Sequence, residues 1–318
     1  MKPFGVLAAA ICFSTGLKAQ DKPIPLLQAV PQPHHQTSFQ REGIELARFH
    51  YAPTLNRPFV FPIIGPSGRS LTRIGHPHDP TGHSHHNSCW VSHHDVNGVT
   101  FWGDTGTNVG RIVTLRVDRL DDGDTSAAVI STSQWQDKAG QTLLVERRRT
   151  AVELLPSKEM RLVVDLEFTA KEKPVTFGKT PFGIFAVRVA KTMGVNDGGG
   201  QIRNSAGNIN EQGENGCFWK AAKWVDYSGP VANNVTEGLT LLDHASNPNH
   251  PSVFHVRADG WMGSSLTFHA PLIVDPAKPL RLRYAVYVHA GRPAPAALDA
   301  QWEAFSKTAL FDFNAKKP

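Results

Sequence analysis

Hydrophobic and polar side chains alternate along several segments of the chain. Every second position is apolar in residues 160–170 (MRLVVDLEFTA) and 280–291 (LRLRYAVYVHAG), and residues 111–120 (RIVTLRVDRL) follow the same period. A period of two is typical of antiparallel strands that bury one face. Turn-forming residues separate these segments, for example at 65–68 (GPSG) and 197–200 (DGGG). The pattern predicts an all-β fold, namely a large antiparallel β-sandwich with few helices.

One segment near the C-terminus has helical spacing instead. It places Leu298, Trp302 and Phe305 three or four residues apart, which predicts one helix face. Residues 21–40 are rich in Pro, Gln and His and show no period, so we predict a leader or linker there. A length of 318 residues fits one large all-β domain, and we predict a single β-sandwich domain over residues 41–318.

The first twenty residues have the pattern of a secretory signal peptide. Lys2 precedes an apolar run from Phe4 to Phe13, and small residues follow near the expected cleavage site. We expect cleavage near Ala19 or Gln20 and export to the periplasm or the cell exterior. No later apolar run approaches the length of a membrane-spanning helix, so we expect no membrane span.

The charge pattern argues against a nucleic-acid partner. The formal net charge at pH 7 is +5, and the basic residues are scattered along the chain. The densest run, Arg147 to Arg149, would alternate between the two faces of a strand. A nucleic-acid-binding surface needs clustered basic residues, often with aromatic residues between them. We therefore expect no nucleic acid to bind.

Two cysteines remain after the predicted signal peptide, Cys89 and Cys217. In an oxidising compartment they could form a disulfide, or they could stay as two separate buried thiols. The sequence leaves both alternatives open, and it does not determine the oligomeric state.

Histidines are concentrated in one segment. Residues 76–102 contain seven of the fifteen histidines of the chain. Imidazole titrates near neutral pH and is a common metal ligand, so this segment is a candidate site. We predict that His85 and His86 are catalytic acid–base groups. The candidate substrate-binding residues of this segment are Trp90, His94, Asp95, Asn97 and Trp102.

A metal is an alternative use of the same segment. His76, His78 and His83 are candidate ligands of a divalent ion such as Zn, Cu or Ca. Their spacing matches no zinc motif such as His-Glu-x-x-His, and proton transfer by histidine needs no metal. We therefore expect that no cofactor is required.

Carboxylates and tryptophans occur together in residues 204–230. Sugar sites use aromatic faces against C–H groups, polar side chains against hydroxyls, and a carboxyl group as acid or base. Glu211 and Glu214 are the candidate catalytic carboxylates. The candidate substrate-binding residues are Asn204, Trp219, Trp224, Asp226 and Tyr227, together with Arg188 from an earlier strand-like run. A Gly-rich loop around two core tryptophans is the structural alternative.

A third polar segment covers residues 241–260. His255 and Arg257 lie two apart on an expected strand, so they share a face, and we predict that both are catalytic. The candidate substrate-binding residues are Asp243, His244, Asn247 and His250, which lie beside turn-forming prolines. A strand that simply faces solvent would explain the same pattern.

These segments resemble motifs of the DUF6807 family, which also carries the label methane oxygenase PmoA. The similar segments are 82–104 (GHSHHNSCWVSHHDVNGVTFWGD), 198–230 (GGGQIRNSAGNINEQGENGCFWKAAKWVDYSGP) and 241–257 (LLDHASNPNHPSVFHVR). The resemblance extends from about Phe59 to Trp302. Family members often have an arginine after the paired histidines, where this chain has Asn87.

The resemblance implies a fold similar to that of galactose mutarotase, a supersandwich. By analogy, it also implies a sugar bound on one sheet, with histidine and carboxylate groups as acid and base. The methane-oxygenase label would require several membrane-spanning helices, which this sequence does not have. We do not adopt that label.

The sequence leads to one main hypothesis and two alternatives. The main hypothesis is an exported carbohydrate-active enzyme that catalyses hydrolysis, elimination or epimerisation at a glycosidic or anomeric centre. The alternatives are a non-catalytic glycan-binding protein and a metalloenzyme with Cu or Zn in the histidine segment. The chain has no Gly-x-Ser-x-Gly elbow and no P-loop, which argues against common hydrolases and NTPases.

Overall fold

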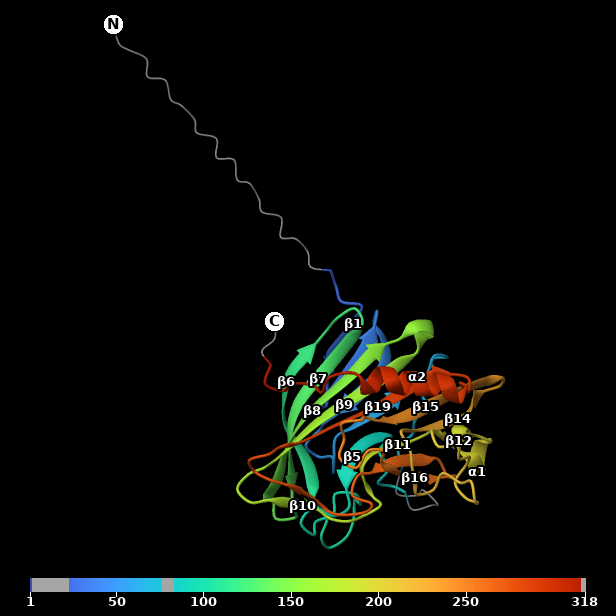
Figure 1. Ribbon diagram of the computed structural model, residues 1–318. Coiled ribbons are helices and arrows are strands. Elements are labelled where there is room, and N and C mark those ends of the chain that lie inside the picture. The colour runs from blue at the N-terminus through green and yellow to red at the C-terminus, as the bar shows by residue number, and fades with distance from the viewer. Residues whose placement is uncertain (2–22, 76–82, 316–318) are drawn as a thin grey trace.

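The computed structural model describes Met1 and residues 23–75 and 83–315, and two large antiparallel sheets dominate them (Figure 1). The nine-stranded sheet has the spatial order β1 (Leu27–Gln32), β2 (Gln36–Arg41), β3 (Ile44–His50), β4 (Phe59–Ile63), β5 (Cys89–His93), β11 (Gly183–Arg188), β17 (Trp261–Ser265), β16 (Val253–Arg257) and β13 (Lys220–Ala221). The eight-stranded sheet has the order β12 (Gln201–Asn204), β14 (Trp224–Ala232), β15 (Val235–Asp243), β19 (Leu280–Ala290), β9 (Met160–Ala170), β8 (Thr142–Leu154), β7 (Ser126–Gln136) and β6 (Arg111–Asp121). The prediction of an antiparallel β-sandwich is confirmed.

Smaller elements complete the described chain. β10 (Val175–Phe177) pairs with β18 (Leu272–Val274) in a two-stranded sheet. The α-helices are α1 (Val195–Gly198) and α2 (Pro295–Ser306), and the 3-10 turns are η1 (Pro156–Lys158) and η2 (Lys191–Met193). Among the described residues, no helix has the length and apolar character needed to cross a membrane.

The core lies between the inner faces of the two large sheets. The alternating side chains of β9 and β19 point into it, including the fully buried Phe168 and Tyr284. The Tyr284 ring stacks on Phe185 of β11 in the opposite sheet, with ring centroids 5.4 Å apart. Burial of one such large side chain contributes about 1.5–3 kcal/mol. The period of two in the sequence therefore marked the inward faces of these strands correctly.

The predicted C-terminal helix is confirmed as α2, which lies across the outer face of the eight-stranded sheet (Figure 1). Leu298 and Phe305 pack against Val163 and Ala285 of the sheet. Pro295 is the first helical residue, where its missing N–H costs no hydrogen bond. The helix thus buries the second face of strands that are already buried on their first.

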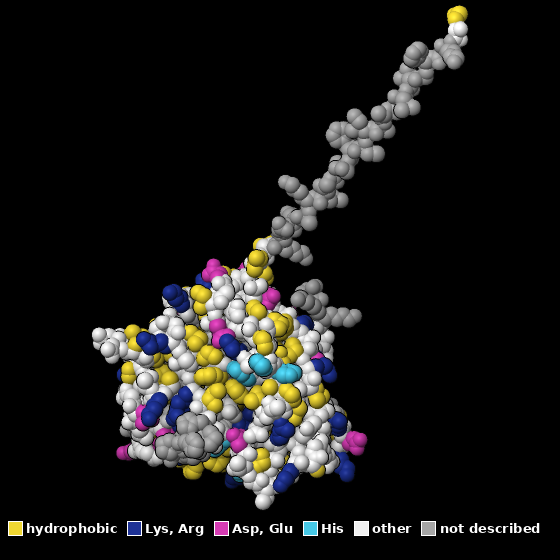
Figure 2. All heavy atoms as spheres, turned by 180° about the vertical axis from the view of Figure 1, so that it is seen from behind, with side chains coloured by type: hydrophobic (Ala, Val, Ile, Leu, Met, Phe, Trp, Pro, Cys, Tyr) yellow, Lys and Arg dark blue, Asp and Glu magenta, His cyan; other side chains and the backbone are white. Residues whose placement is uncertain are grey.

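The arginine run in β8 alternates between the two sheet faces, as expected. Arg148 points inward and pairs with the buried Glu146 at 2.6 Å. Arg147 and Arg149 lie on the outer face, where Phe313 and Phe311 of the C-terminal segment cover them at 5.0 and 5.1 Å. On the side of the molecule away from α2, Lys and Arg side chains are scattered among acidic and apolar ones (Figure 2).

The predicted linker over residues 21–40 needs correction, because β1 and β2 form a hairpin at the edge of the nine-stranded sheet. Leu27 and Phe39 are fully buried, and the Ala29 N–H donates to Asp122 at 2.7 Å. Each strand is short: β1 has three apolar residues besides Pro31, and β2 has only Phe39. That pattern is too brief to stand out from a linker in the sequence.

The alternation predicted for β6 is only partly realised. The pairing of β6 with β7 shifts register between Thr114 and Arg116 and again between Val117 and Arg119. Each bulge changes which side chains face the core. Leu115, expected on the inner face, is therefore 50% exposed.

The two cysteines are free thiols, not a disulfide. Cys89 lies in β5 and Cys217 lies in the loop before β13, and both are buried. Burial raises the pKa of both thiols, since it disfavours the charged thiolate.

Candidate functional site

Four cross-strand neighbours form one row on the outer face of the nine-stranded sheet. Trp90 of β5 pairs with Ala186 of β11, which pairs with Gly263 of β17, which in turn pairs with His255 of β16. A Cβ atom at Gly263 would lie only 3.3 Å from the Trp261 ring. The small residues in the middle of the row therefore make room for the Trp261 indole between two larger side chains.

The next row carries the charges of the site. Arg188 pairs with Trp261, which pairs with Arg257. The Arg188 side chain is fully buried, and its Nη1 lies 2.9 Å from His83 Nδ1 and 3.1 Å from His86 Nδ1. The same Nη1 lies 3.6 Å from Oδ1 of Asp259, in the turn between β16 and β17. One guanidinium thus brings two loops together over the sheet.

Aromatic rings stack above this guanidinium. The imidazoles of His83 and His86 are 4.4 Å apart and nearly parallel, and His86 stacks in turn on Trp90 at 5.0 Å. His86 also contacts Trp261 at 5.0 Å, and His85 contacts Trp102 at 6.2 Å. We call the following residues the histidine–tryptophan cluster: His83, His85, His86, Trp90, Trp102, Arg188, Asp259 and Trp261.

His83 has a partner for each state of its Nδ1 atom. Nδ1 lies 3.0 Å from Oδ2 of Asp259 as well as 2.9 Å from the Arg188 guanidinium. A protonated Nδ1 donates to the carboxylate, whereas an unprotonated Nδ1 accepts from arginine, which is always a donor. The two contacts therefore stabilise opposite protonation states of one ring nitrogen. This arrangement suits a group that takes up and releases a proton.

The other histidines of the cluster are held neutral. Burial lowers the pKa of His85 to about 4 and the pKa of His86 well below its usual value, and nearby positive groups act in the same direction. Burial by itself would raise the pKa of Asp259, but its contacts with His83 and Arg188 lower it. At neutral pH the cluster therefore combines the neutral imidazoles of His85 and His86 with the ionised carboxylate of Asp259.

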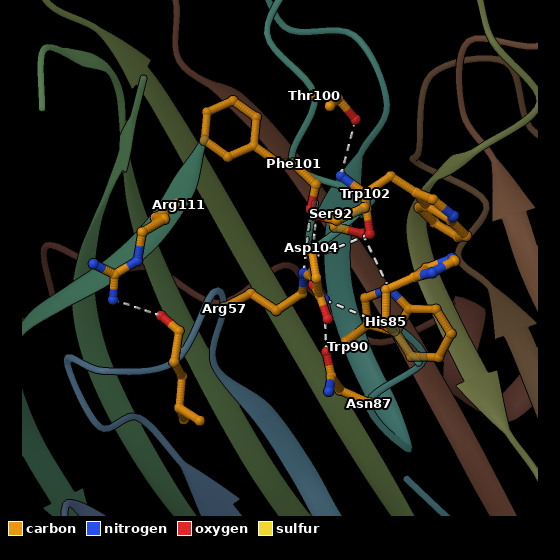
Figure 3. A network of polar contacts seen from close by, with 12 residues as sticks. Arg57, His85, Asn87, Trp90, Ser92, Thr100, Phe101, Trp102, Asp104 and Arg111 are labelled. Carbon is orange, nitrogen blue, oxygen red and sulfur yellow. Dashed lines mark hydrogen bonds and ion pairs between the residues drawn. The ribbon is translucent and has the colours of Figure 1, made fainter. Parts of the chain in front are cut away.

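Arg57 anchors the cluster. The sequence gave no reason to select this buried arginine. Arg57 is 1% exposed, and every nitrogen of its guanidinium has an acceptor (Figure 3). The acceptors are the carbonyl oxygens of His85, Phe101, Trp102 and Gly103 and the side chains of Asn87 and Asp104. Arg57 thereby joins the histidine loop to the loop that carries Trp102.

Asn87 has a defined place in this network. Its Oδ1 accepts from Arg57 Nη1 at 2.6 Å, next to the ion pair between Arg57 and Asp104 at 2.7 Å (Figure 3). An arginine at position 87 would bring a second positive charge to this point. The asparagine therefore fits the buried guanidinium.

Further aromatic rings surround His255 beside the cluster. Its ring lies 4.5 Å from Trp261, 4.9 Å from Phe218 and 5.1 Å from Phe182. Trp219 lies further out, at 6.1 Å, and is exposed. His86 and His255 thus contact the same indole, that of Trp261.

The predicted carboxylates differ in their positions. Glu211 pairs with Arg257 at 3.0 Å and accepts the Ala258 N–H at 2.6 Å, so it holds the turn that carries Asp259. Glu214 is exposed and makes no ion pair with the described residues of the cluster. Asp259, which the sequence analysis did not select, is the carboxylate that pairs with a histidine here.

Comparison with known proteins identifies the family of the chain. The chain matches the profile of a family of unknown function, DUF6807, over residues 36–303. The chain belongs to the DUF6807 family. No curated protein matches it in sequence.

Some solved structures are similar to this DUF6807 protein at low scores. A candidate mutarotase (YeaD) from Salmonella typhimurium has a TM-score of 0.32 and 10% identity, with 83% of this chain and 97% of that chain covered. A candidate kojibiose phosphorylase from the human microbiome has a TM-score of 0.34 and 9% identity, covering 90% of this chain and 37% of that one. A TPR-domain-containing protein from Parabacteroides distasonis has a TM-score of 0.31 and 11% identity, with 84% of this chain and 49% of that chain covered. Similarities this low assign no function to the chain.

One group of predicted site residues in the DUF6807 protein lies elsewhere, beneath α2. Asp243 is fully buried and accepts from Asn247 Nδ2, His250 Nδ1 and the Ser252 N–H, each at 2.8 Å. His244 lies beside Phe305 and bonds to the Thr308 carbonyl. These residues secure the C-terminal helix, and we do not include them in the site.

Residues of β14 are also structural. Trp224 is fully buried and donates to Asp299 of α2 at 2.9 Å. Asp226 is buried on the same sheet face, between Arg203 at 2.6 Å and His289 at 2.9 Å. Tyr227 points into the core, where its hydroxyl donates to the Ala258 carbonyl and so supports the Asp259 turn from behind.

The remaining predicted residues shape loops. His94 and Asp95 follow β5, and Asp95 and Asn97 accept the N–H groups of Gly98 and Thr176. Asn204 accepts the N–H groups of Ala206 and Asn208, so it closes the turn after β12. None of these contacts reaches a residue of the cluster.

The metal hypothesis involves residues outside the described ranges. His76 and His78 are not among the described residues, whereas His83 belongs to the cluster. Within residues 23–75 and 83–315, no group of three or more His, Cys, Asp or Glu side chains is arranged to hold a metal ion.

We expect the protein to lose stability as the pH falls below about 6.5. Burial lowers the pKa of His255 from 6.5 to about 3, so the unfolded chain binds a proton in this range that the folded chain does not. Stability then rises with pH, and His255 alone accounts for a loss of about 2 kcal/mol between pH 7 and pH 5. Urea unfolding at both pH values measures this change in wild-type protein and in His255→Phe. A loss as large in His255→Phe as in wild type would contradict the prediction, and His34→Phe on an exposed turn serves as control.

Proposed function

We propose that this DUF6807 protein is an exported carbohydrate-active enzyme that moves a proton at a glycosidic or anomeric centre. His83 and Asp259 are its acid–base pair. The observation that carries the proposal is the position of His83 Nδ1, 3.0 Å from Asp259 and 2.9 Å from Arg188. Export is inferred from the first twenty residues of the sequence.

The surroundings of the pair favour a sugar as substrate. Partly exposed rings of Phe182 and Phe218 lie close to the cluster, and aromatic faces pack well against sugar C–H groups. Neutral imidazoles such as His85 offer one donor and one acceptor each, which matches a hydroxyl group.

The geometry describes a proton cycle at His83. In the resting state, His83 Nδ1–H donates to Asp259, so that Nε2 carries the lone pair and the neutral imidazole can act as base there. After proton uptake, the Asp259 carboxylate stabilises the imidazolium, which then acts as acid and returns the proton. Arg188 keeps its hydrogen bond to His86 through the cycle, so the guanidinium stays in place. Hydrolysis, elimination and epimerisation each require one proton to be removed and one to be delivered.

A non-catalytic glycan-binding protein is the second candidate. The observation that favours it is Trp219, whose large ring is exposed at the edge of the site. Binding modules present such rings to sugars without an acid–base pair beside them. The His83–Asp259 pair favours the enzyme.

A substrate screen tests the proposal. We expect wild-type protein to convert at least one plant or algal glycan, because His83 has a hydrogen-bond partner in both its protonated and its neutral state. Reducing-end release reports hydrolysis, ultraviolet absorbance of unsaturated products reports elimination, and NMR exchange of the anomeric proton reports epimerisation. Glycan binding without any conversion would establish the binding protein instead. Neither binding nor conversion across the screen would overturn both candidates.

A further inference from the structure

His255 lies beside the histidine–tryptophan cluster but takes no part in its hydrogen bonds. Its side chain is only 4% exposed, and neither Nδ1 nor Nε2 has a hydrogen-bond partner among the described residues. A neutral imidazole carries one donor and one acceptor, and a buried polar atom without a partner is costly. The protein therefore leaves two polar atoms in a place where a ligand could satisfy them.

A second unsatisfied donor lies next to His255. Trp261 is 3% exposed, and its ring is 4.5 Å from the His255 ring. Its Nε1 has no hydrogen-bond partner within the part of the chain that the structure describes. Two other buried tryptophans of the same sandwich have their N–H groups paired. Trp90 donates to Ser92 at 3.0 Å and Trp135 to Glu146 at 2.7 Å. The N–H of Trp261 differs from both of these.

The outer edge of this location carries a strained, exposed indole. Trp219 is 45% exposed and has a φ of 56°, in the left-handed region that bulky residues seldom adopt. Its ring stacks on Phe218 at 4.4 Å and meets Phe268 at 5.6 Å. Strain of this kind is retained at functional sites when the surrounding structure enforces it.

We infer that His255, Trp261, Phe182, Phe218 and Trp219 form a second sugar subsite, which takes a neutral pyranose ring next to the reacting one. The inference rests on the proposed function, since it extends the same site. The ring would stack on the exposed aromatic edge, and its hydroxyls would pair with the nitrogens of His255 and Trp261. Phe182 connects the two subsites, since it contacts both His255 at 5.1 Å and Trp102 at 5.6 Å. The substrate is then an oligosaccharide rather than a monosaccharide.

The chemistry of the subsite specifies an uncharged ring. Burial lowers the pKa of His255 to about 3, and the positive charge of Arg257 acts in the same direction, so the imidazole is neutral. The negative charge of Asp259 opposes that shift. A neutral imidazole and an indole N–H match hydroxyl groups. A carboxylated sugar would need a cation to pair with, and the nearby Arg257 already pairs with Glu211 at 3.0 Å.

Calorimetric titration tests the inference, with neutral cello-, xylo-, malto- and laminari-oligosaccharides and a uronic-acid oligosaccharide as probes. We expect a neutral oligosaccharide to bind, and Trp219→Ala and His255→Phe to weaken its affinity by roughly tenfold each. His255→Phe keeps the ring volume, and Trp219→Ala changes an exposed position, so thermal unfolding should confirm that both variants fold. His34→Phe, on an exposed turn, is the matched control.

The outcomes separate this inference from the proposed function. Unchanged affinity in both variants, preference for the uronic-acid probe, or no binding of any probe would overturn the subsite. Conversion by wild-type protein in the substrate screen would still support the acid–base pair in each of these cases. Conversely, oligosaccharide binding that depends on Trp219 and His255 but occurs without turnover would support the subsite and overturn the enzyme.

Discussion

Replacing Asp259 with asparagine should lower turnover by roughly 10²–10⁴-fold, the range for loss of general acid–base catalysis. The amide keeps the shape of the side chain but carries no negative charge. The imidazolium of His83 would lose the counter-charge that lies 3.0 Å from its Nδ1. Nδ1 could then accept from Arg188 at 2.9 Å instead, which places the ring proton on Nε2 and removes the base. Initial rates on the glycan identified in the substrate screen measure the effect.

Three further measurements sharpen this prediction. Asp259 is a positioning residue that acts through His83, so the pH–rate profile should change in Asp259→Asn. His83→Gln should lose a similar factor, and the double variant should lose little more, because the two residues act as a unit. Asp197→Asn, in the exposed α1, is the matched control. Full activity in Asp259→Asn, or additive losses in the double variant, would contradict the proposed pair.

Replacing Arg57 with methionine should destabilise the fold by about 3 kcal/mol. The substitution keeps most of the apolar side-chain length but removes the donors to four carbonyl groups and to Asn87 and Asp104 (Figure 3). Asp104 would lose the counter-charge that now lies 2.7 Å away. Urea unfolding measures the loss of stability. Because the loops of His85 and Trp102 would separate, turnover should fall as well.

Arg111 provides the matched control for Arg57. It also donates to backbone carbonyls, those of Pro53 and Leu55, but its side chain is exposed (Figure 3). Arg111→Met should therefore change stability by no more than about 0.5 kcal/mol. Equal effects of the two substitutions would show that Arg57 is not the anchor of the site.

Polar residues of the eight-stranded sheet show where inference from the sequence reached its limit. Trp224, Asp226 and Asp243 looked like site residues, because strands that carry tryptophan and carboxylates together are typical of sugar sites. In the structure, α2 and neighbouring strands cover them, and each carboxylate is paired inside the protein. The local sequence does not distinguish a buried carboxylate that is paired within the protein from one that binds a substrate.

Asp259 and Trp261 illustrate the opposite case. Both follow the predicted catalytic residues His255 and Arg257 along the chain, in a turn that carries no motif of its own. Their importance comes from Arg188, which lies about seventy residues earlier and pairs with Trp261 across two neighbouring strands. The order of strands in a sheet depends on long-range packing, which the period of two does not encode.

The sequence by itself determined the β-sandwich, the inward faces of β9 and β19, the C-terminal helix and the concentration of histidines before β5. These features depend on local periodicity, which a strand or helix expresses whatever its neighbours are. Only the tertiary structure decided that His83 meets Asp259 and Arg188, that Arg57 joins two loops, and that His255 has no hydrogen-bond partner in residues 23–75 and 83–315. Those outcomes depend on which strands lie side by side, because a hydrogen bond or its absence is set by atoms from distant parts of the chain.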